Sequence, residues 1–244
     1  LCSKEIEEIE PATEKETPGV EKEKAWELVW EDKFNRTGLP DDETWSYEIG
    51  YIRNNEAQYY TEKRKENARV EDGNLIIEAR KDDWSGREIT SASLHTYGKK
   101  SILYGRVEVR AKLPTGRGTW PAIWMLGNSI QTGTKWPDCG ETKAYNHVMG
   151  TNKGKKIEVE EPWDTYHVYA IEWFPNKIDF FVDGKKYFSF GNENTGNATW
   201  PFDKPHYLII NLAIGGGWGG QEGIDESIFP QKYYIDYVKV YQQK

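Results

Sequence analysis

Hydrophobic and polar residues alternate along most of this chain, in short runs that end at turn residues. The alternation is clearest in GRVEVRAKL (105–113) and YYIDYVKVYQ (233–242). It also runs through KIDFFVDGKKYFSF (177–190), on both sides of an Asp-Gly pair that is typical of a tight hairpin turn. HYLIINLAI (206–214) is apolar at nearly every position, as a central strand would be. No helical periodicity lasts for three turns, so the pattern predicts an antiparallel β-sandwich or barrel.

The start of the chain breaks this pattern. LCSKEIEEIEPATEKETPGVEKEK is charged, contains proline and has few residues that could join a core, so we expect a disordered tether over residues 1–25 and one domain over residues 26–244. Cys2 could carry the lipid anchor of a bacterial lipoprotein whose signal peptide has been removed; the alternative is an incidental thiol, because Leu1 is not the usual small neighbour. Cys139 is the only other cysteine, so we expect no disulfide framework.

Composition and motifs exclude several classes of function, and they say less about the fold. The net charge of −8 argues against a nucleic-acid partner, which needs a basic face, and no run of about 18 apolar residues predicts a transmembrane span. The four histidines lack metal-site spacing, and no nucleophile elbow or phosphate-binding loop occurs. Eleven tryptophans and fifteen tyrosines fit a large β-core, and equally a groove of flat rings for sugars. Paired carboxylates, which cleave glycosidic bonds, remain as candidate chemistry.

Nine segments then carry a resemblance to glycoside hydrolase family 16, in its laminarinase and mixed-linkage β-glucanase branch. They occur in the family's order and cover Trp26 to Gln243: RNNEAQYYT (53–61), VEDGNLIIEAR (70–80), YGRVEVRAKLP (104–114), GTWPAIWML (118–126), WPDCGE (136–141), HVYAIEW (167–173), FFVDG (180–184), NLAIGGGWGG (211–220) and IDYVKVYQ (235–242). The resemblance implies an all-β jelly-roll of two curved antiparallel sheets with a concave substrate cleft. It also implies a monomer that hydrolyses internal β-glucan linkages with retention and without a catalytic cofactor.

The catalytic strand departs from the family. There it reads G-E-I-D-I-M-E, in which the first Glu is the nucleophile, the last is the general acid/base and the Asp tunes the pair. This chain keeps Gly140 and Glu141; read without gaps, it then places Lys143 for the Asp and Asn146 for the acid. However, TKAYNHVMGT (142–151) itself resembles the family segment that follows the next strand. We therefore expect Glu141 to be the nucleophile, and about twenty residues, two strands and a turn, to be missing after it.

Three readings of the function stay open, and the first two differ in how they explain this gap. Loss of two adjacent strands from the cleft floor would expose the core and create new sheet edges. This favours a protein that contains the strands although this sequence skips them, and that cleaves β-1,3- or mixed β-1,3/1,4-glucans. The alternative is a true deletion, which leaves a catalytically inactive glycan-binding protein. A galactan hydrolase of the same family is a third reading, disfavoured by the glucanase-like cleft motifs. For all three we expect a secreted protein or a cell-surface or outer-membrane lipoprotein of a bacterium.

The resemblance also implies substrate-binding residues. Trp120 and Trp124, four positions apart, could be core rings, but in the family the first faces sugar. Trp218, in a glycine-rich run, resembles an aromatic platform beside the cleft. Asn55 matches a cleft asparagine that hydrogen-bonds sugar hydroxyls, and Arg87 is a weaker candidate. Flat apolar rings and side-chain donors are the groups that bind pyranoses.

A structural calcium is the last expectation that the resemblance carries. The nearest matches to the family's oxygen ligands are Asp32 (or Glu31), the turn carbonyl of Gly73, and Asp236. Lys33 stands where the family often has Glu, which makes this end of the chain less acidic.

Overall fold

The computed structural model describes residues 25–142, 145–148, 151–197 and 199–244, without the side chains of residues 142–154. The predicted tether and Cys2 therefore lie outside the described residues, apart from Ala25. The first strand begins at Trp26, where we placed the start of the domain. No helix in this part of the chain is long and apolar enough to cross a bilayer.

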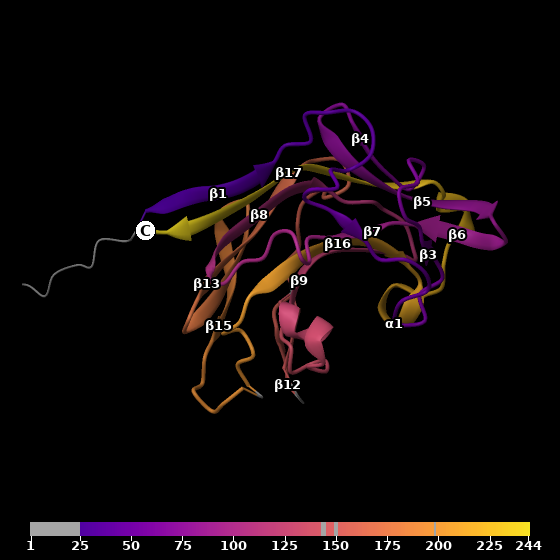
Figure 1. The fold of residues 1–244 in the computed structure, drawn as a ribbon. Helices are drawn as coiled ribbons and strands as arrows, with labels where there is room; N and C mark the ends of the chain where they lie inside the picture. Colours follow the sequence, from indigo (N-terminus) through magenta and orange to yellow (C-terminus); the bar gives the residue numbers. More distant parts are fainter. Residues whose placement is uncertain (1–24, 143–144, 149–150, 198) are drawn as a thin grey trace, which may run out of the picture.

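Two β-sheets face each other and make up the body of the fold (Figure 1). The larger has the order β15-β14-β13-β8-β17-β5-β6-β3, with β1 beside β17 and β4 beside β5. Its strands are β1 (Trp26–Asp32), β3 (Tyr59–Tyr60), β4 (Ala68–Glu71), β5 (Asn74–Trp84), β6 (Arg87–Ser91), β8 (Gly105–Lys112), β13 (His167–Phe174), β14 (Lys177–Val182), β15 (Lys185–Gly191) and β17 (Gln231–Gln243). All pairs are antiparallel except β3 with β6.

The smaller sheet has the order β10-β9-β16-β7-β2 and is antiparallel throughout. Its strands are β2 (Ser46–Tyr47), β7 (Ser93–His95), β9 (Thr119–Gly127), β10 (Glu141–Thr142) and β16 (His206–Ile214). The strands β11 (Tyr145–Val148) and β12 (Thr151–Gly154) form a separate hairpin. The short helical turns are η1 (Asn128–Thr132), α1 (Gly216–Gly219) and η2 (Glu226–Ile228). Figure 1 shows α1 and β12 below the smaller sheet, at its two ends.

The sequence pattern explains the strands that build the core. In β8 every second residue is buried, as its alternation predicts, because successive side chains point to opposite faces. All nine residues of β16 are buried, so this strand is covered on both faces. The hairpin of β14 and β15 turns at Asp183 and Gly184, both at positive φ, as the Asp-Gly pair predicts. The antiparallel sandwich that the pattern predicts is confirmed.

The two faces of the smaller sheet have different surroundings. Met125, Leu208 and Ile210 belong to the main core between the sheets. Their neighbours along the strands, Trp124 and Ile209, belong to a second cluster on the opposite face. We call this opposite face, which points away from the larger sheet, the cleft face.

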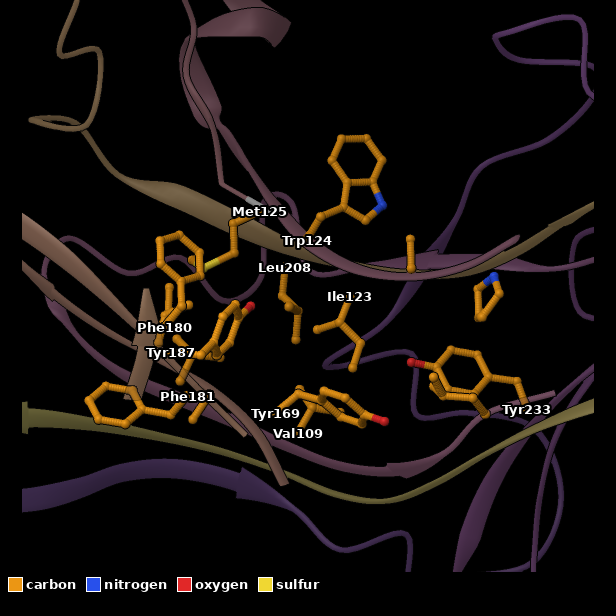
Figure 2. Close-up of a pocket in the computed structure, with 16 residues that line it drawn as sticks. Val109, Ile123, Trp124, Met125, Tyr169, Phe180, Phe181, Tyr187, Leu208 and Tyr233 are labelled. Atoms are coloured by element: carbon orange, nitrogen blue, oxygen red, sulfur yellow. The ribbon is translucent and has the colours of Figure 1, made fainter. Parts of the chain in front are cut away.

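The sandwich is incomplete where β10 ends. β10 pairs only with Leu126 and Met125, so in the described part of the chain the edge of β9 from Thr119 to Trp124 lacks a partner on that side. Between β9 and the outer strands β13 to β15 lies a cavity of about 240 Å³. Figure 2 shows the side chains of Ile123, Met125 and Leu208 pointing into it from the smaller sheet, and those of Tyr169, Phe180 and Tyr187 from the larger.

Candidate active site

The candidate nucleophile, Glu141, lies on the cleft face at the edge of the smaller sheet. Its register partner on β9 is Leu126, which in turn pairs with Tyr207 on β16; paired residues share a face, and both of these belong to the cleft-face cluster. Glu141 is 6% exposed, and its Oε2 accepts a hydrogen bond of 2.8 Å from Trp136 Nε1. The hydrogen bond fixes the orientation of the carboxylate, as a nucleophile requires.

The residue before Glu141 has to be glycine. Gly140 adopts a φ of 80°, and a Cβ atom there would come within 2.7 Å of His206 Nε2 and 2.8 Å of the Pro201 carbonyl oxygen. The backbone therefore passes closely over the start of β16 just before it delivers Glu141 to the cleft face. This is the physical reason for the Gly-Glu pair that the sequence retains.

Trp124 is held in the middle of the cleft face by a hydrogen-bond chain. Its Nε1 donates to Asn211 Oδ1 at 2.8 Å, and Asn211 Nδ2 donates to the Tyr60 hydroxyl at 2.9 Å. The Tyr60 hydroxyl donates to Glu56 Oε2 at 3.2 Å. Trp124 is only 8% exposed, and the guanidinium of Arg53 lies over its ring, 5.1 Å from the centroid.

The turn that contains Asn55 connects this chain of hydrogen bonds to the rim of the cleft. Asn54 and Asn55 both adopt positive φ and are exposed. Asn54 Nδ2 donates to Glu56 Oε1 at 3.0 Å, and the Asn54 carbonyl accepts from the Gly217 amide at 3.1 Å. Gly217 belongs to α1, the turn that carries Trp218. The asparagine turn and the glycine-rich turn are therefore fixed to each other.

Trp218 and Trp120 form the exposed aromatic part of the cleft. Their ring centroids are 6.5 Å apart at an interplanar angle of 33°, and Trp218 is 48% exposed. Trp120 pairs with Ala213 on β16, an even number of positions along β9 from Trp124, and therefore shares its face. The structure thus brings together Trp120, Trp218 and the Asn55 turn, as predicted substrate-binding groups should be.

Arg87 lies elsewhere. It belongs to β6 in the larger sheet, where its guanidinium lies 4.2 Å from the Tyr59 ring centroid and 5.5 Å from that of Trp84. Its Nη1 donates to the Ser85 carbonyl at 2.9 Å. The structure therefore places Arg87 in an aromatic cluster of the other sheet rather than beside Glu141.

The described residues offer no general acid beside Glu141. Two carboxylates near the cleft face, Glu48 and Glu56, lie toward the β2 end of the sheet, and both have partners: Glu48 pairs with Arg53, and Glu56 accepts from three side chains. Asn146, the ungapped replacement for the acid, lies in β11 and pairs with Lys153 in the separate hairpin. Lys143 lies outside the described residues.

The predicted calcium ligands do not fit a calcium site. The Asp32 carboxylate accepts from the Phe34 amide and from Trp45 Nε1, both at 2.9 Å, while Asp236 forms an ion pair with Arg110 at 2.5 Å. The surface pocket at Glu31 and Asp32 is also lined by Lys33 and Arg36, whose charges oppose a cation. In the part of the chain that the structure describes, no three His, Cys, Asp or Glu side chains converge, and the Gly73 turn completes no cage.

Several residues of the site were not predicted from the sequence. Arg53, Glu48 and Asn211 interact across strands and loops that only the register brings together, so no local pattern marks them. Trp136 is different: it opens the segment WPDCGE that identified Glu141, and its spacing of five residues was an available signal.

Comparison with known proteins gives this fold and site a context. Residues 55–239 match the model of the family described as "Glycosyl hydrolases family 16". A β-glucanase of Rhodothermus marinus is 50% identical, and the alignment covers 89% of this chain and 85% of the relative. The laminarinase structure from the same organism superimposes with a TM-score of 0.85 at 48% identity, over 91% of this chain and all of the other. The structure of SCLam, a "non-specific endo-beta-1,3(4)-glucanase", gives 0.83 at 42%, over 90% and 92%. The jelly-roll expectation is confirmed.

In the same comparison, part of the relative has no counterpart in this chain. The alignment with the Rhodothermus marinus β-glucanase runs over 244 positions but includes 89% of this chain's own 244 residues, or about 217. About 27 aligned positions therefore hold a residue of the relative opposite a gap in this chain. That surplus is large enough for the two strands and a turn expected after Glu141.

Proposed function

This chain belongs to glycosyl hydrolase family 16, and we propose that it is built as a retaining endo-hydrolase of β-1,3- or mixed β-1,3/1,4-glucans with Glu141 as its nucleophile. The observation that carries the proposal is the position of Glu141: a buried, oriented carboxylate on the cleft face, the face of the smaller sheet that also carries Trp124 and Trp120. The relatives described above are glucanases, and exposed rings such as Trp218 offer flat surfaces to pyranose faces.

The chemistry requires one more carboxyl group. In a retaining glycosidase the nucleophile attacks the anomeric carbon while a second carboxylic acid, about 5–5.5 Å away, protonates the leaving oxygen. That acid then acts as a base when water hydrolyses the glycosyl–enzyme intermediate. Glu141 supplies the first role. The described residues supply no partner at that position, and we propose that the second role falls to residues that are missing after Glu141.

We propose that a block of about twenty residues, carrying the general acid, belongs between Glu141 and Thr142. Three features support it. The described part of β10 covers only Glu141 and Thr142, so the edge of β9 beside the cavity has no described partner. The cavity is lined by apolar side chains of both sheets, as a place for core-facing strand residues would be. Finally, the alignment with the relative has a surplus of the required size.

A peptide map tests this directly. Trypsin cleaves after Lys135 and Lys143, so a chain in which Thr142 directly follows Glu141 yields the peptide WPDCGETK (136–143). If the block exists in the protein, that peptide is absent and a longer one starts at Trp136. The longer protein should release reducing sugar from laminarin and from barley β-glucan; failure to cleave either would refute the proposed function.

A second function follows if the short peptide is found. The chain would then be a glycan-binding protein that keeps the cleft but has lost its acid. General acid catalysis contributes about 10²–10⁴-fold, so we expect no useful turnover from it. Retarded migration in a laminarin-containing gel, without release of reducing sugar, would establish binding alone.

We also propose that the protein acts as a monomer outside the cell or at a bacterial surface, where β-glucan is accessible. Support comes from Cys2 at the head of a charged segment of the length of a tether. Labelled palmitate should enter the full precursor expressed in a bacterium, and not its Cys2→Ala variant. Equal label in both would remove the lipid anchor, and a dimer mass in light scattering would remove the monomer.

A further inference from the structure

The cleft face between Trp124 and the β2 edge carries a charged pair that none of the predicted site residues includes. Arg53 reaches over the Trp124 ring from the loop between β2 and β3, and pairs with Glu48, the residue after β2. Glu48 is fixed in turn by Ser93, whose hydroxyl donates to its Oε2 at 2.5 Å. Ser93 lies on β7 and pairs with Asn211, the partner of Trp124.

This arrangement changes which group the cleft presents to a ligand. Trp124 is 8% exposed, so little of its ring is left for a sugar to stack on. The side chain of Arg53 above it is 23% exposed. Glu48 takes only the Nη2 group, and Nε and Nη1 have no acceptor within the part of the chain that the structure describes. Partly exposed guanidinium donors form hydrogen bonds with an acceptor, which is either water or a ligand oxygen.

The Arg53 guanidinium stays positively charged in this position. Burial opposes it, but the Glu48 carboxylate beside it raises the pKa of the guanidinium above its ordinary value. Glu48 also neutralises the pair, so the site has no net attraction for anions. Donors on a neutral, rigid pair suit hydroxyl oxygens of an uncharged ligand.

We propose that Arg53 is a substrate-binding residue, which donates hydrogen bonds through Nε and Nη1 to pyranose hydroxyls in the cleft, and that Trp124 acts beneath it as its support. This inference rests on the proposed function, since it takes the ligand of the cleft to be a β-glucan. It gives the middle of the cleft a polar subsite, whereas Trp120 and Trp218 give the rim an aromatic one.

The test compares binding of a linear β-1,3-linked glucose hexasaccharide by the unaltered chain and three variants, using isothermal titration calorimetry. Hydrogen bonds to a charged donor predict that Arg53→Ala weakens binding about 10- to 100-fold. Arg53→Lys keeps the charge but loses the planar fork, so its loss should be intermediate. Arg110→Ala is the matched control: Arg110 also pairs with a carboxylate, Asp236, and lies 4.7 Å from the Tyr166 centroid, but on the larger sheet.

The outcomes separate this inference from the proposed function. If Arg53 only covers Trp124, then Arg53→Ala exposes an indole face that stacks on sugar, and binding stays the same or tightens; that result overturns the inference. If the unaltered chain does not bind the hexasaccharide, both the inference and the proposed function fail. Near-UV circular dichroism and urea unfolding show whether each variant is folded. If Arg53→Ala loses binding because it misfolds, the binding affinity of the folded Arg53→Lys variant tests the inference instead.

Discussion

The cavity beside β10 offers a quantitative test of the missing block. The change is a graft: the residues of the Rhodothermus marinus β-glucanase that align opposite the gap are inserted between Glu141 and Thr142. If they form two strands of the smaller sheet, their core-facing side chains fill the space between β9 and β13 to β15. The matched control is a glycine-serine insertion of the same length, which adds residues but no apolar side chains.

The expected gain follows from the cavity volume. Sealed cavities cost about 24 cal/mol per Å³, and because this cavity of 240 Å³ is open to solvent on one side, the corresponding value of about 6 kcal/mol is an upper bound. The loss of conformational entropy when the new strands become ordered offsets part of this stabilisation. We therefore expect the graft to raise the free energy of unfolding by about 3 kcal/mol over the unaltered chain, a large fraction of the roughly 5–15 kcal/mol of an ordinary domain. The glycine-serine control should be no more stable than the unaltered chain.

Urea denaturation followed by tryptophan fluorescence measures both chains. The graft should shift the midpoint upward and also raise the m-value, because more surface is exposed when it unfolds. It should in addition cleave laminarin, which reducing-sugar release detects. A graft that is no more stable than the glycine-serine control would refute the reasoning, since the cavity would then not be the place of the missing strands.

Three further predictions follow from single side chains. In the active graft, Glu141→Gln should abolish hydrolysis of laminarin and leave hexasaccharide binding within about threefold; retained turnover would reject Glu141 as the nucleophile. Burial lowers the pKa of His206 to about 4, so the stability it contributes is complete above pH 6.5 and is lost as the pH falls toward 4. Between pH 7 and pH 4.5, His206→Phe should therefore lose about 2 kcal/mol less unfolding free energy than the parent in urea titrations; equal losses would contradict this. Trp218→Ala should weaken binding about tenfold without changing the urea midpoint, because the ring is half-exposed; unchanged binding would exclude it as a sugar platform.

The sequence predicted the strands better than it predicted their neighbours. Alternation located β8 and the β14–β15 hairpin, and the continuous apolar run located β16, because the residue pattern of a strand follows directly from whether one or both of its faces are buried. The pattern does not determine which residues of neighbouring strands pair with each other. That Glu141 stands opposite Leu126 follows from the turn that precedes it and from the close passage of Gly140 over His206.

Trp124 shows most clearly why the site was only partly predictable. Its position in the segment GTWPAIWML suggested either a core ring or a ring beside the sugar, and it does lie on the cleft face. The guanidinium that lies over the ring belongs to Arg53, which comes from a loop far away in the sequence and is placed by Glu48 and Ser93. Such long-range contacts leave no periodic trace, and for the same reason the sequence did not indicate that Arg87 lies against Tyr59 and Trp84.

The two ends of the cleft differ in how far they depend on the missing residues. Toward β2, Trp124, Asn211, Tyr60 and Glu56 satisfy one another by hydrogen bonds that involve no residue beyond Glu141 except Asn211 itself, which β16 supplies. Toward β10, Glu141 lies at a sheet edge above an open cavity. Because buried hydrogen-bond networks rigidify the groups they join, the β2 end should remain a binding surface even in a chain that lacks the block. Binding and hydrolysis are therefore separable in this protein, and a loss of hydrolysis alone says nothing about the state of the sugar-binding floor.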